Sequence, residues 1–261
     1  MYDVAAMDAA LAQSIFSGKL HFARSTGSTN SDAVEAARNG APHGSVYFAD
    51  EQTAGRGRGD HTWQSDAGAG LYASVLLRPV MDLKHLPLIP LAAGLAAAQA
   101  VFIAAQLKVD LRWPNDLLIV ERKAGGILVE SKAERGEVSY VVIGIGINVH
   151  QRTFDPSLAT PGTSLDLESG RAIRRQELLI RLLESLQSET ALLHDAAVVA
   201  AIPARVAQRS TWLWNRKVEV HGPQSCIGVT AGLDENGFLR VRTGAGIVTV
   251  QTGGIRAAKA E

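Results

Sequence analysis

The stretch GILVESKAERGEVSYVVIGIGINV, residues 126–149, decides the expected fold. Its two apolar segments, residues 126–132 and 138–149, are rich in β-branched side chains, and the polar tetrapeptide ERGE lies close to their junction. This arrangement predicts two antiparallel strands that form a hairpin. Gly144 and Gly146 interrupt the second strand, which is typical of a strand that another backbone or a ligand approaches closely.

Outward from this hairpin, further strands are predicted at residues 20–24, 46–49, 71–77, 109–113 and 117–120. Apolar periodicity predicts helices at residues 3–17, through 33–38, across 88–107 and from Leu178 to about Leu193. Residues 153–171 have an irregular pattern. Together these elements predict an α+β fold in which helices flank a mixed, mostly antiparallel sheet.

The composition changes near Asn215. From there on, short strand patterns alternate with glycine-rich turns, and DENG at residues 234–237 is a strong hairpin signal. We therefore predict a main domain over residues 1–214 and a small β-barrel over residues 215–261.

Bulk composition excludes several classes of protein. Lysine plus arginine and aspartate plus glutamate balance at 26 each, so no global field favours nucleic acid or an anionic membrane. Cys226 is the only cysteine, which excludes an intrachain disulfide and fits a reducing cytoplasm. Residues 88–107 carry no charge, but they are alanine-rich and contain Pro90 and Gly94, which favours a buried helix over a membrane span.

Glycine and arginine alternate in EQTAGRGRGDHTW, residues 51–63, which we call the Gly/Arg loop. Glycine exposes its backbone N–H at close range, and arginine presents a planar fork of donors to carboxylate and phosphate oxygens. The pattern suggests a loop that folds over an anionic or activated-acid ligand. By itself it is equally compatible with a flexible surface loop, for example one that binds RNA.

Three more polar clusters lie at ends or turns of predicted strands: STN at residues 28–30, RWPND at 112–116 followed by KAGG at 123–126, and GIGIN at 144–148. Alone, the first could simply cap a helix. The sequence has no Walker A pattern, nucleophile elbow or HExxH, and its seven histidines lack metal-ligand spacing. The GxGxxA pattern at residues 68–73 begins a strand, so we expect a turn there.

STN, EQTAGRGRG…W, RWPND, KAGGIL and GIGINV, in this order, resemble the catalytic domain of biotin–protein ligases over residues 20–195. The β-barrel resembles the SH3-like C-terminal domain of that family. The resemblance implies a fold similar to class II aminoacyl-tRNA synthetases. It also implies an ATP-dependent ligase that joins biotin to AMP and then transfers biotin to a lysine of a carrier protein.

The resemblance also implies site residues. Catalytic roles fall to Lys123, Asp116 and Arg58. Biotin contacts fall to Ser28, Thr29, Asn30, Gln52, Arg56, Gly57, Arg58, Lys123, Gly126 and Gly144. Nucleotide contacts fall to Arg56, Arg58, Trp63, Asn115, Lys123 and Asn148.

The chemistry of these residues fits the implied reaction. Ser28, Thr29, Asn30 and Gln52 offer the mixed donors and acceptors that a ureido ring requires. Lys123 can stabilise charge during adenylation, although a hairpin lysine is by default a surface residue. For Asp116 the resemblance implies orientation of Lys123 or help in holding Mg²⁺ with ATP, against the alternative of an ordinary turn aspartate.

Partners are implied in the same way. We expect a biotin carboxyl carrier protein domain as acceptor, a monomer or weak homodimer, no membrane association and a cytoplasmic location. The residues before the first predicted strand are too few for a helix-turn-helix domain, so sequence-specific DNA binding is not expected.

The chain departs from the family in one place. The loop of the family usually reads GRGRxGRxW, whereas this chain has GRGRGDHTW, with Asp60 and His61 in place of a Gly-Arg pair. We expect weaker retention of ATP or the adenylate. Two other functions stay open: a lipoate or octanoyl ligase of the same fold, disfavoured by EQTAGRGRG and RWPND, and a non-catalytic ligand sensor, disfavoured because Arg56, Arg58, Asp116 and Lys123 are all present.

Overall fold

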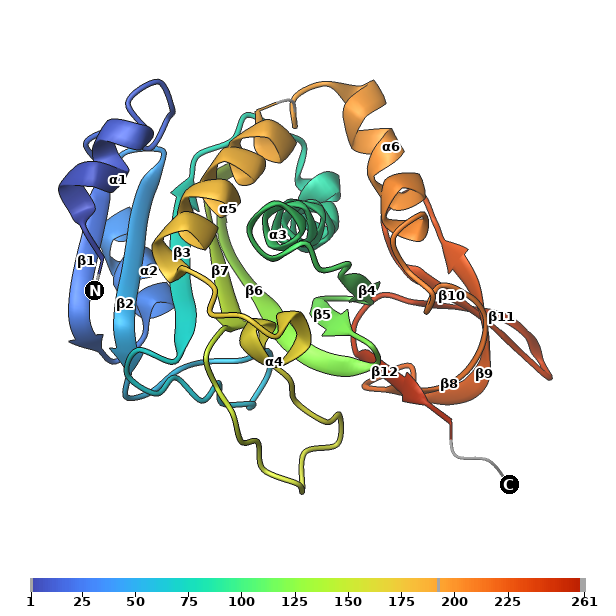
Figure 1. Ribbon diagram of the computed structural model, residues 1–261. Coiled ribbons are helices and arrows are strands. Elements are labelled where there is room, and N and C mark those ends of the chain that lie inside the picture. The colour runs from blue at the N-terminus through green and yellow to red at the C-terminus, as the bar shows by residue number, and fades with distance from the viewer. Residues whose placement is uncertain (1, 192, 259–261) are drawn as a thin grey trace.

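The computed structural model describes residues 2–191 and 193–258, which form two sheets (Figure 1). The larger sheet has seven strands in the order β1-β2-β3-β7-β6-β5-β4. Their bounds are β1 Leu20–Thr26, β2 Ser45–Gln52, β3 Gly70–Leu77, β4 Asp110–Arg112, β5 Asp116–Ile119, β6 Arg122–Glu134 and β7 Glu137–Asn148. The predicted hairpin is therefore confirmed as β6–β7, which lies in the middle of the sheet.

Antiparallel pairing holds throughout the larger sheet except between β1 and β2. A parallel pair needs a crossover connection, and α2, Thr29–Arg38, supplies it. In the β6–β7 ladder Gly126 pairs with Gly146, and Leu128 pairs with Gly144. This register places the glycines of both KAGGIL and GIGINV side by side at one end of the hairpin.

Helices cover both faces of the larger sheet (Figure 1). On one face, α2 packs through Ala33 and Ala37 on β3 and β7. On the other face lie α3, Ile89–Ala105, and α5, Arg175–Thr190, whose leucines are buried as the periodicity predicts. All eight residues of β3 are buried, which fits a strand covered on both sides.

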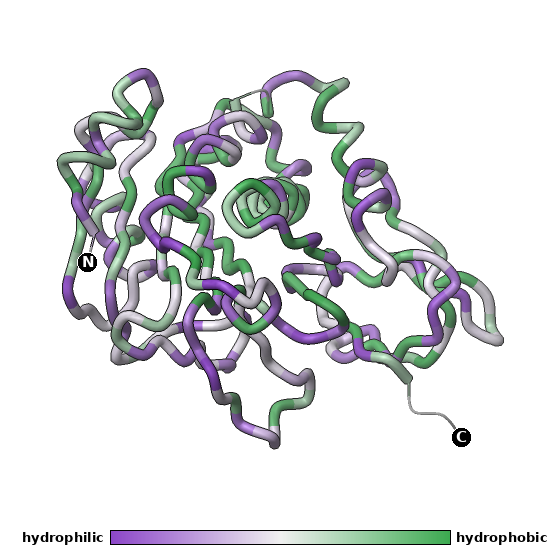
Figure 2. The backbone as a smooth tube through the Cα atoms, viewed as in Figure 1, coloured by the Kyte–Doolittle hydropathy of each residue, from purple (hydrophilic) through white to green (hydrophobic). Residues whose placement is uncertain are grey.

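The apolar helix α3 is the centre of the core. With the preceding 3₁₀ turn η1, Leu83–Leu88, it is long and apolar enough to cross a membrane by length and composition, but 72% of its most apolar window is buried inside the protein. Figure 2 shows hydrophobic residues gathered on this helix and on the central strands, with hydrophilic residues along many of the loops. The predicted core helix is thus confirmed, with bounds two residues shorter at its C-terminal end.

The smaller sheet has five antiparallel strands in the order β11-β10-β9-β8-β12, and we call it the C-terminal sheet. Its bounds are β8 Trp214–His221, β9 Cys226–Leu233, β10 Leu239–Thr243, β11 Gly246–Val250 and β12 Gly254–Ala257. The indole of Trp113 in the larger sheet's β4–β5 turn donates to the carbonyl of Gly237 at 3.0 Å. Arg216 forms a two-pronged ion pair with Glu121, at 2.7 and 2.8 Å. These contacts attach the C-terminal sheet to the body of the protein.

Several predicted elements differ from the structure. The first helix, α1, spans only Val4–Ala10, because the chain turns after Leu11 to bury Phe16, and the carboxylate of Asp8 accepts from the N–H of Gly18. The segment predicted as irregular contains the short helix α4, Leu165–Ser169. Helix α6, Ala196–Ala207, was not predicted, since Pro203 in its interior is a helix-breaking signal.

Candidate active site

The Gly/Arg loop connects β2 to β3 and folds back on itself. The N–H of Trp63 donates to the carbonyl of Gly55 at 2.9 Å, and the N–H of Gly57 donates to that of His61 at 2.7 Å. A Cβ at position 55 would lie 2.3 Å from the Trp63 carbonyl, so only glycine fits where the two arms meet. At the tip, Gly59 has φ of +63°, a conformation that glycine readily adopts. The loop is therefore a small flap.

The flap carries Trp63 onto the paired glycines of β6 and β7. A Cβ at Gly146 would lie 2.6 Å from the indole, and one at Gly126 would lie 3.4 Å from it. The Nζ of Lys123 lies 5.6 Å from the centre of a Trp63 ring, within cation–π range. The paired glycines thus leave space above the hairpin, as the sequence predicts. In this structure the indole of Trp63 fills that space.

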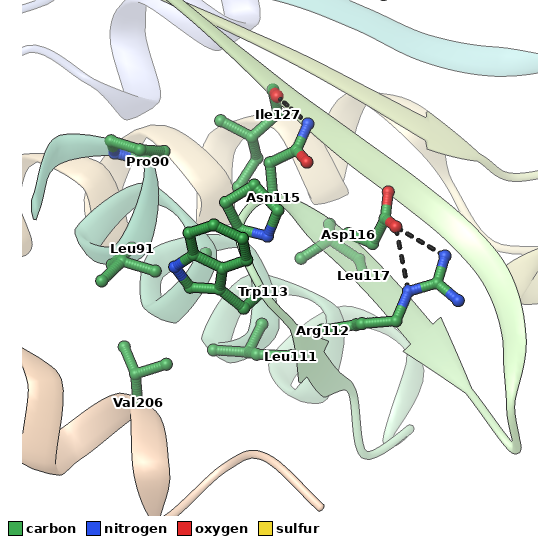
Figure 3. Close-up of a pocket in the computed structure, with 12 residues that line it drawn as sticks. Pro90, Leu91, Leu111, Arg112, Trp113, Asn115, Asp116, Leu117, Ile127 and Val206 are labelled. Atoms are coloured by element: carbon green, nitrogen blue, oxygen red, sulfur yellow. Dashed lines mark hydrogen bonds and ion pairs between the residues drawn. The ribbon is translucent and has the colours of Figure 1, made fainter. Parts of the chain in front are cut away.

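Lys123 belongs to a cluster of three charged side chains. Its Nζ lies 2.6 Å from Oδ1 of Asp116, and Nη2 of Arg112 lies 2.6 Å from Oδ2 of the same carboxylate. Figure 3 shows Arg112 and Asp116 joined across the β4–β5 turn, where the two residues are register partners. Arg112 and Asp116 are largely buried, whereas Lys123 keeps 32% of its side chain exposed. Asp116 therefore fixes the position of an ammonium group that solvent and ligands can reach.

The carboxylate at the centre of this cluster is held in its ionised form by its two cationic neighbours. Burial opposes ionisation of Asp116, but Lys123 and Arg112 outweigh it, and the pKa of the carboxyl lies below its ordinary value. A carboxyl whose pKa is lowered on folding contributes stability above its unfolded pKa, near 4, and loses that contribution as the pH falls through the folded value. Asp116 is thus ionised at neutral pH.

Both oxygens of Asp116 are already paired with cationic side chains. Within residues 2–191 and 193–258, no three histidine, cysteine, aspartate or glutamate side chains gather to hold a metal ion. Protein sites for Mg²⁺ commonly combine one or two carboxylates with the phosphates of a bound nucleotide. The predicted role of Asp116 in orienting Lys123 has direct contacts in its favour, and its role toward Mg²⁺ stays a prediction.

A small cavity lies behind this cluster, on the side that faces α3 and α6 (Figure 3). Its volume of about 10 Å³ is enough for roughly one water molecule. Trp113, Pro90, Leu91 and Val206 are among its lining residues. This cavity is a packing gap and not a ligand site, even though Arg112 and Asp116 border it.

Thr29 and Asn30 of the STN motif belong to a buried hydrogen-bond network. The side chain of Ser28 makes no capping hydrogen bond, although the residue takes the N-cap position of α2. The hydroxyl of Thr29 contacts Oε1 of Gln52 at 3.1 Å and Oγ of Ser74 at 2.8 Å. Ser74 also donates to Oδ1 of Asn30 at 3.1 Å. The helix-cap alternative therefore does not account for these side chains, which join the end of β2 to β3.

Asn30 lies against Gly144, and this contact gives a testable prediction. A Cβ at position 144 would lie 2.3 Å from Oδ1 of Asn30, so Gly144→Ala must displace the amide. Loss of a buried polar contact of this kind costs about 1–3 kcal/mol. We expect the variant to bind biotin roughly tenfold or more weakly, measured by calorimetry, while a matched Gly244→Ala change in an open turn leaves binding unchanged. Equal affinities for both variants would contradict the predicted contact of Asn30 with biotin.

Arg56 pairs with Glu130, a residue that the sequence analysis did not predict for the site. Its guanidinium forms a two-pronged ion pair with Glu130 of β6, at 2.9 Å for each prong. Glu130 also accepts from Nδ2 of Asn30 at 2.5 Å. An acidic residue inside the apolar run GILVES was the available signal, because Glu130 shares a strand face with Gly126. The carboxylate thus engages the flap arginine at the place where the sequence predicts an anionic ligand.

The two asparagines predicted to contact nucleotide are bonded to the backbone. Nδ2 of Asn115 donates to the carbonyl of Ile127 at 2.7 Å. Nδ2 of Asn148 donates to the carbonyls of Thr163 and Lys123, at 3.0 and 3.3 Å. Both amides therefore contact β6, the strand that carries Lys123, and their contact with nucleotide stays a prediction.

Arg58, also predicted as a site residue, contacts the turn between β11 and β12 of the C-terminal sheet. Its guanidinium donates to the carbonyl of Gly253 and, at 3.0 Å, to Oγ1 of Thr252 in the C-terminal sheet. The structure therefore brings Lys123, Asp116 and Trp63 together and places Asn30 and Arg56 on Glu130, while Arg58 links the flap to a different part of the chain.

Comparisons with known proteins show which family the chain belongs to. The sequence profile of the Biotin/lipoate A/B protein ligase family matches residues 22–148. The chain is 33% identical to the biotin–[acetyl-CoA-carboxylase] ligase of Mycobacterium tuberculosis over 237 residues. This alignment covers 88% of this chain and 85% of that protein. The chain belongs to the biotin–protein ligase family.

A second biotin–protein ligase relative is the bifunctional ligase/repressor BirA of Bacillus spizizenii. It is 36% identical over 234 residues, 87% of this chain and 70% of that protein. Among solved structures, the biotin protein ligase of Aquifex aeolicus in complex with biotin and ATP matches with a TM-score of 0.77 and 26% identity, over 92% of this chain and 98% of that one. The family and the fold class predicted from the motifs are both confirmed.

Proposed function

We propose that Lys123, held by Asp116 beneath the Gly/Arg loop, stabilises the negative charge that develops during adenylation of biotin in this biotin–protein ligase. The enzyme attaches biotin to a lysine of a carboxylase carrier protein in an ATP-dependent reaction. In the first step a carboxylate oxygen of biotin attacks the α-phosphorus of ATP, and pyrophosphate leaves. In the second, the carrier amine attacks the acyl carbon of biotinyl-AMP, loses a proton and displaces AMP.

One observation carries this proposal: the ammonium of Lys123 lies 2.6 Å from Asp116 and under the indole of the flap. Negative charge develops on the phosphoryl oxygens during adenylation, and a preorganised cation in a covered site stabilises it strongly. Asp116 neutralises part of the charge at rest and aims the side chain. Arg112 balances the charge of Asp116 from the buried side, so the three side chains keep a net positive charge.

The flap supplies the second requirement, which is exclusion of water. Biotinyl-AMP is a mixed anhydride, and a closed site protects such a species from hydrolysis. Trp63 and Arg56 reach the β6–β7 hairpin from the flap, so closure of the loop covers the paired glycines. In this proposal biotin lies along the Thr29–Asn30–Gln52 network and Gly144, and the nucleotide lies nearer Lys123 and Trp63.

ATP enters with Mg²⁺ on its phosphates, which neutralises charge on the leaving pyrophosphate. The acceptor is the biotin carboxyl carrier domain of a carboxylase. We further propose a cytoplasmic enzyme that acts as a monomer or weak homodimer and has no sequence-specific DNA binding. These partners and states agree with the neutral chain and the single cysteine.

A lipoate ligase is the nearest alternative, because the matched family profile includes both activities. Biotin-dependent exchange of pyrophosphate into ATP separates the two. We expect exchange with biotin, ATP and Mg²⁺ and little with lipoate. Exchange that requires lipoate, or no exchange at all, would refute the proposal.

The altered tip of the flap gives a further prediction. Asp60 and His61 are exposed, and the glycine that the family has at position 60 is found at Gly59. Asp60→Gly combined with His61→Arg removes a negative charge and adds a cation near an anionic ligand. We expect biotinyl-AMP to dissociate severalfold more slowly, in line with the 0.2–1 kcal/mol of an exposed charge contact, as followed by a chase with excess unlabelled biotin. An off-rate equal to that of wild type would contradict the expected effect of this departure.

A further inference from the structure

Arg58 connects the flap to a turn almost 200 residues away in the sequence. Its two guanidinium nitrogens donate to neighbouring acceptors, the carbonyl of Gly253 and the hydroxyl of Thr252. Burial lowers the pKa of Arg58 and the charge of Asp116 opposes that shift, but a guanidinium remains charged at any physiological pH. The contact is therefore a pair of charge-assisted hydrogen bonds, the stronger class.

The receiving turn, residues 251–253, is held independently of Arg58. Gly253 has φ of +132°, and a Cβ there would lie 2.1 Å from the carbonyl of His221, so glycine is required at this crossing. The side chain of Gln224 accepts from the N–H groups of Gln251 and Thr252, at 3.2 and 3.5 Å. The acceptors are thus preformed on a rigid turn.

The C-terminal sheet that carries this turn is itself fixed to the catalytic body. Arg216 pairs with Glu121 and lies 3.6 Å from the centre of a Trp212 ring, and Trp113 donates to Gly237. None of these contacts involves the flap. Arg58 therefore ties the tip of the Gly/Arg loop to a sheet that has its own contacts with the catalytic body.

We infer that residues 251–253 form a latch, which holds the Gly/Arg loop closed through Arg58 and thereby sets how long activated biotin stays bound. The inference rests on the proposed function. It assigns the C-terminal sheet a part in retention of the intermediate, through a residue, Thr252, that touches neither Lys123 nor the Thr29–Asn30 network. The flap opens when Arg58 releases both acceptors.

Thr252→Val tests the latch. Valine keeps the shape of threonine and removes the acceptor, and position 252 is exposed, so the fold tolerates the change. Loss of one charge-assisted hydrogen bond should raise the dissociation rate of preformed biotinyl-AMP about tenfold. The matched control is Thr249→Val, an exposed threonine on β11 of the same sheet, which should leave the rate unchanged.

A double-mutant comparison excludes a merely structural effect. In an Arg58→Met background, Thr252→Val should accelerate dissociation no further, because its partner is already gone. Additive effects, or equal rates for Thr252→Val and Thr249→Val, would overturn the latch. Biotin-dependent pyrophosphate exchange is measured in parallel: its absence in wild type refutes the proposed function, whereas normal exchange with unchanged off-rates refutes the latch alone.

Discussion

Replacement of Lys123 by alanine is expected to lower the rate of biotinyl-AMP formation about a thousandfold. Removal of one preorganised group that stabilises transition-state charge typically costs 10²–10³ in kcat, to which the unpaired face of the Asp116 carboxylate adds. Asp116 keeps its ion pair with Arg112, and about a third of the Lys123 side chain is exposed, so the variant should fold. Single-turnover formation of pyrophosphate is the measurement.

Lys132→Ala is the matched control for this prediction. Lys132 lies on the same strand, β6, and is half exposed, with an ion pair to Glu134 at the far end of the hairpin. We expect it to form biotinyl-AMP at the wild-type rate. A Lys123→Ala enzyme that is folded by circular dichroism and adenylates biotin normally would show that another group provides the stabilisation.

Replacement of Arg58 by methionine is expected to release biotinyl-AMP about a hundredfold faster. Methionine keeps an unbranched stem but loses both hydrogen bonds to residues 252 and 253, and two such bonds at about 1.5 kcal/mol each correspond to that factor. The freed adenylate reacts with any accessible amine, so lysines of bystander proteins should be labelled. Labelling of serum albumin in the presence of biotin and ATP reports this leakage.

The control for Arg58 is Arg240→Met, an exposed arginine on β10. It should leave labelling of albumin at the wild-type level, because it lies away from the flap. If Arg58→Met also labels no more albumin than wild type while still forming biotinyl-AMP, the flap does not retain the intermediate in the way proposed here.

The fold could be predicted from the sequence where pattern and structure depend on the same local signal. The β6–β7 hairpin and the leucines of α5 follow from periodicity, and the glycine-rich turns mark the C-terminal sheet. Prediction failed where a tertiary contact overrode the local pattern. The turn after α1 forms because Asp8 binds Gly18, and α6 continues through Pro203.

In the candidate site, too, local motifs could be predicted from the sequence and long-range contacts could not. The motifs predicted Lys123, Asp116, Thr29, Asn30 and Gln52 as site residues. The structure shows contacts of Lys123 with Asp116, of Thr29 with Gln52, and of Thr29 with Asn30 through Ser74. The motifs did not identify Glu130 or Thr252, whose roles arise only when strand register and chain topology bring them to Arg56 and Arg58. The acidic residue inside GILVES marks Glu130 as unusual, but no local pattern connects it with Arg56, 74 positions away, or connects Thr252 with Arg58, 194 positions away.

In the proposed function, a closed Gly/Arg loop keeps biotinyl-AMP until the correct amine arrives. The most direct test is a single-turnover experiment in which enzyme loaded with labelled biotin and ATP·Mg²⁺ is mixed with a biotin carboxyl carrier domain or with buffer. We expect transfer to one carrier lysine at a rate far above the release of free biotinyl-AMP. Release as fast as transfer, or no adenylate formed at all, would contradict it.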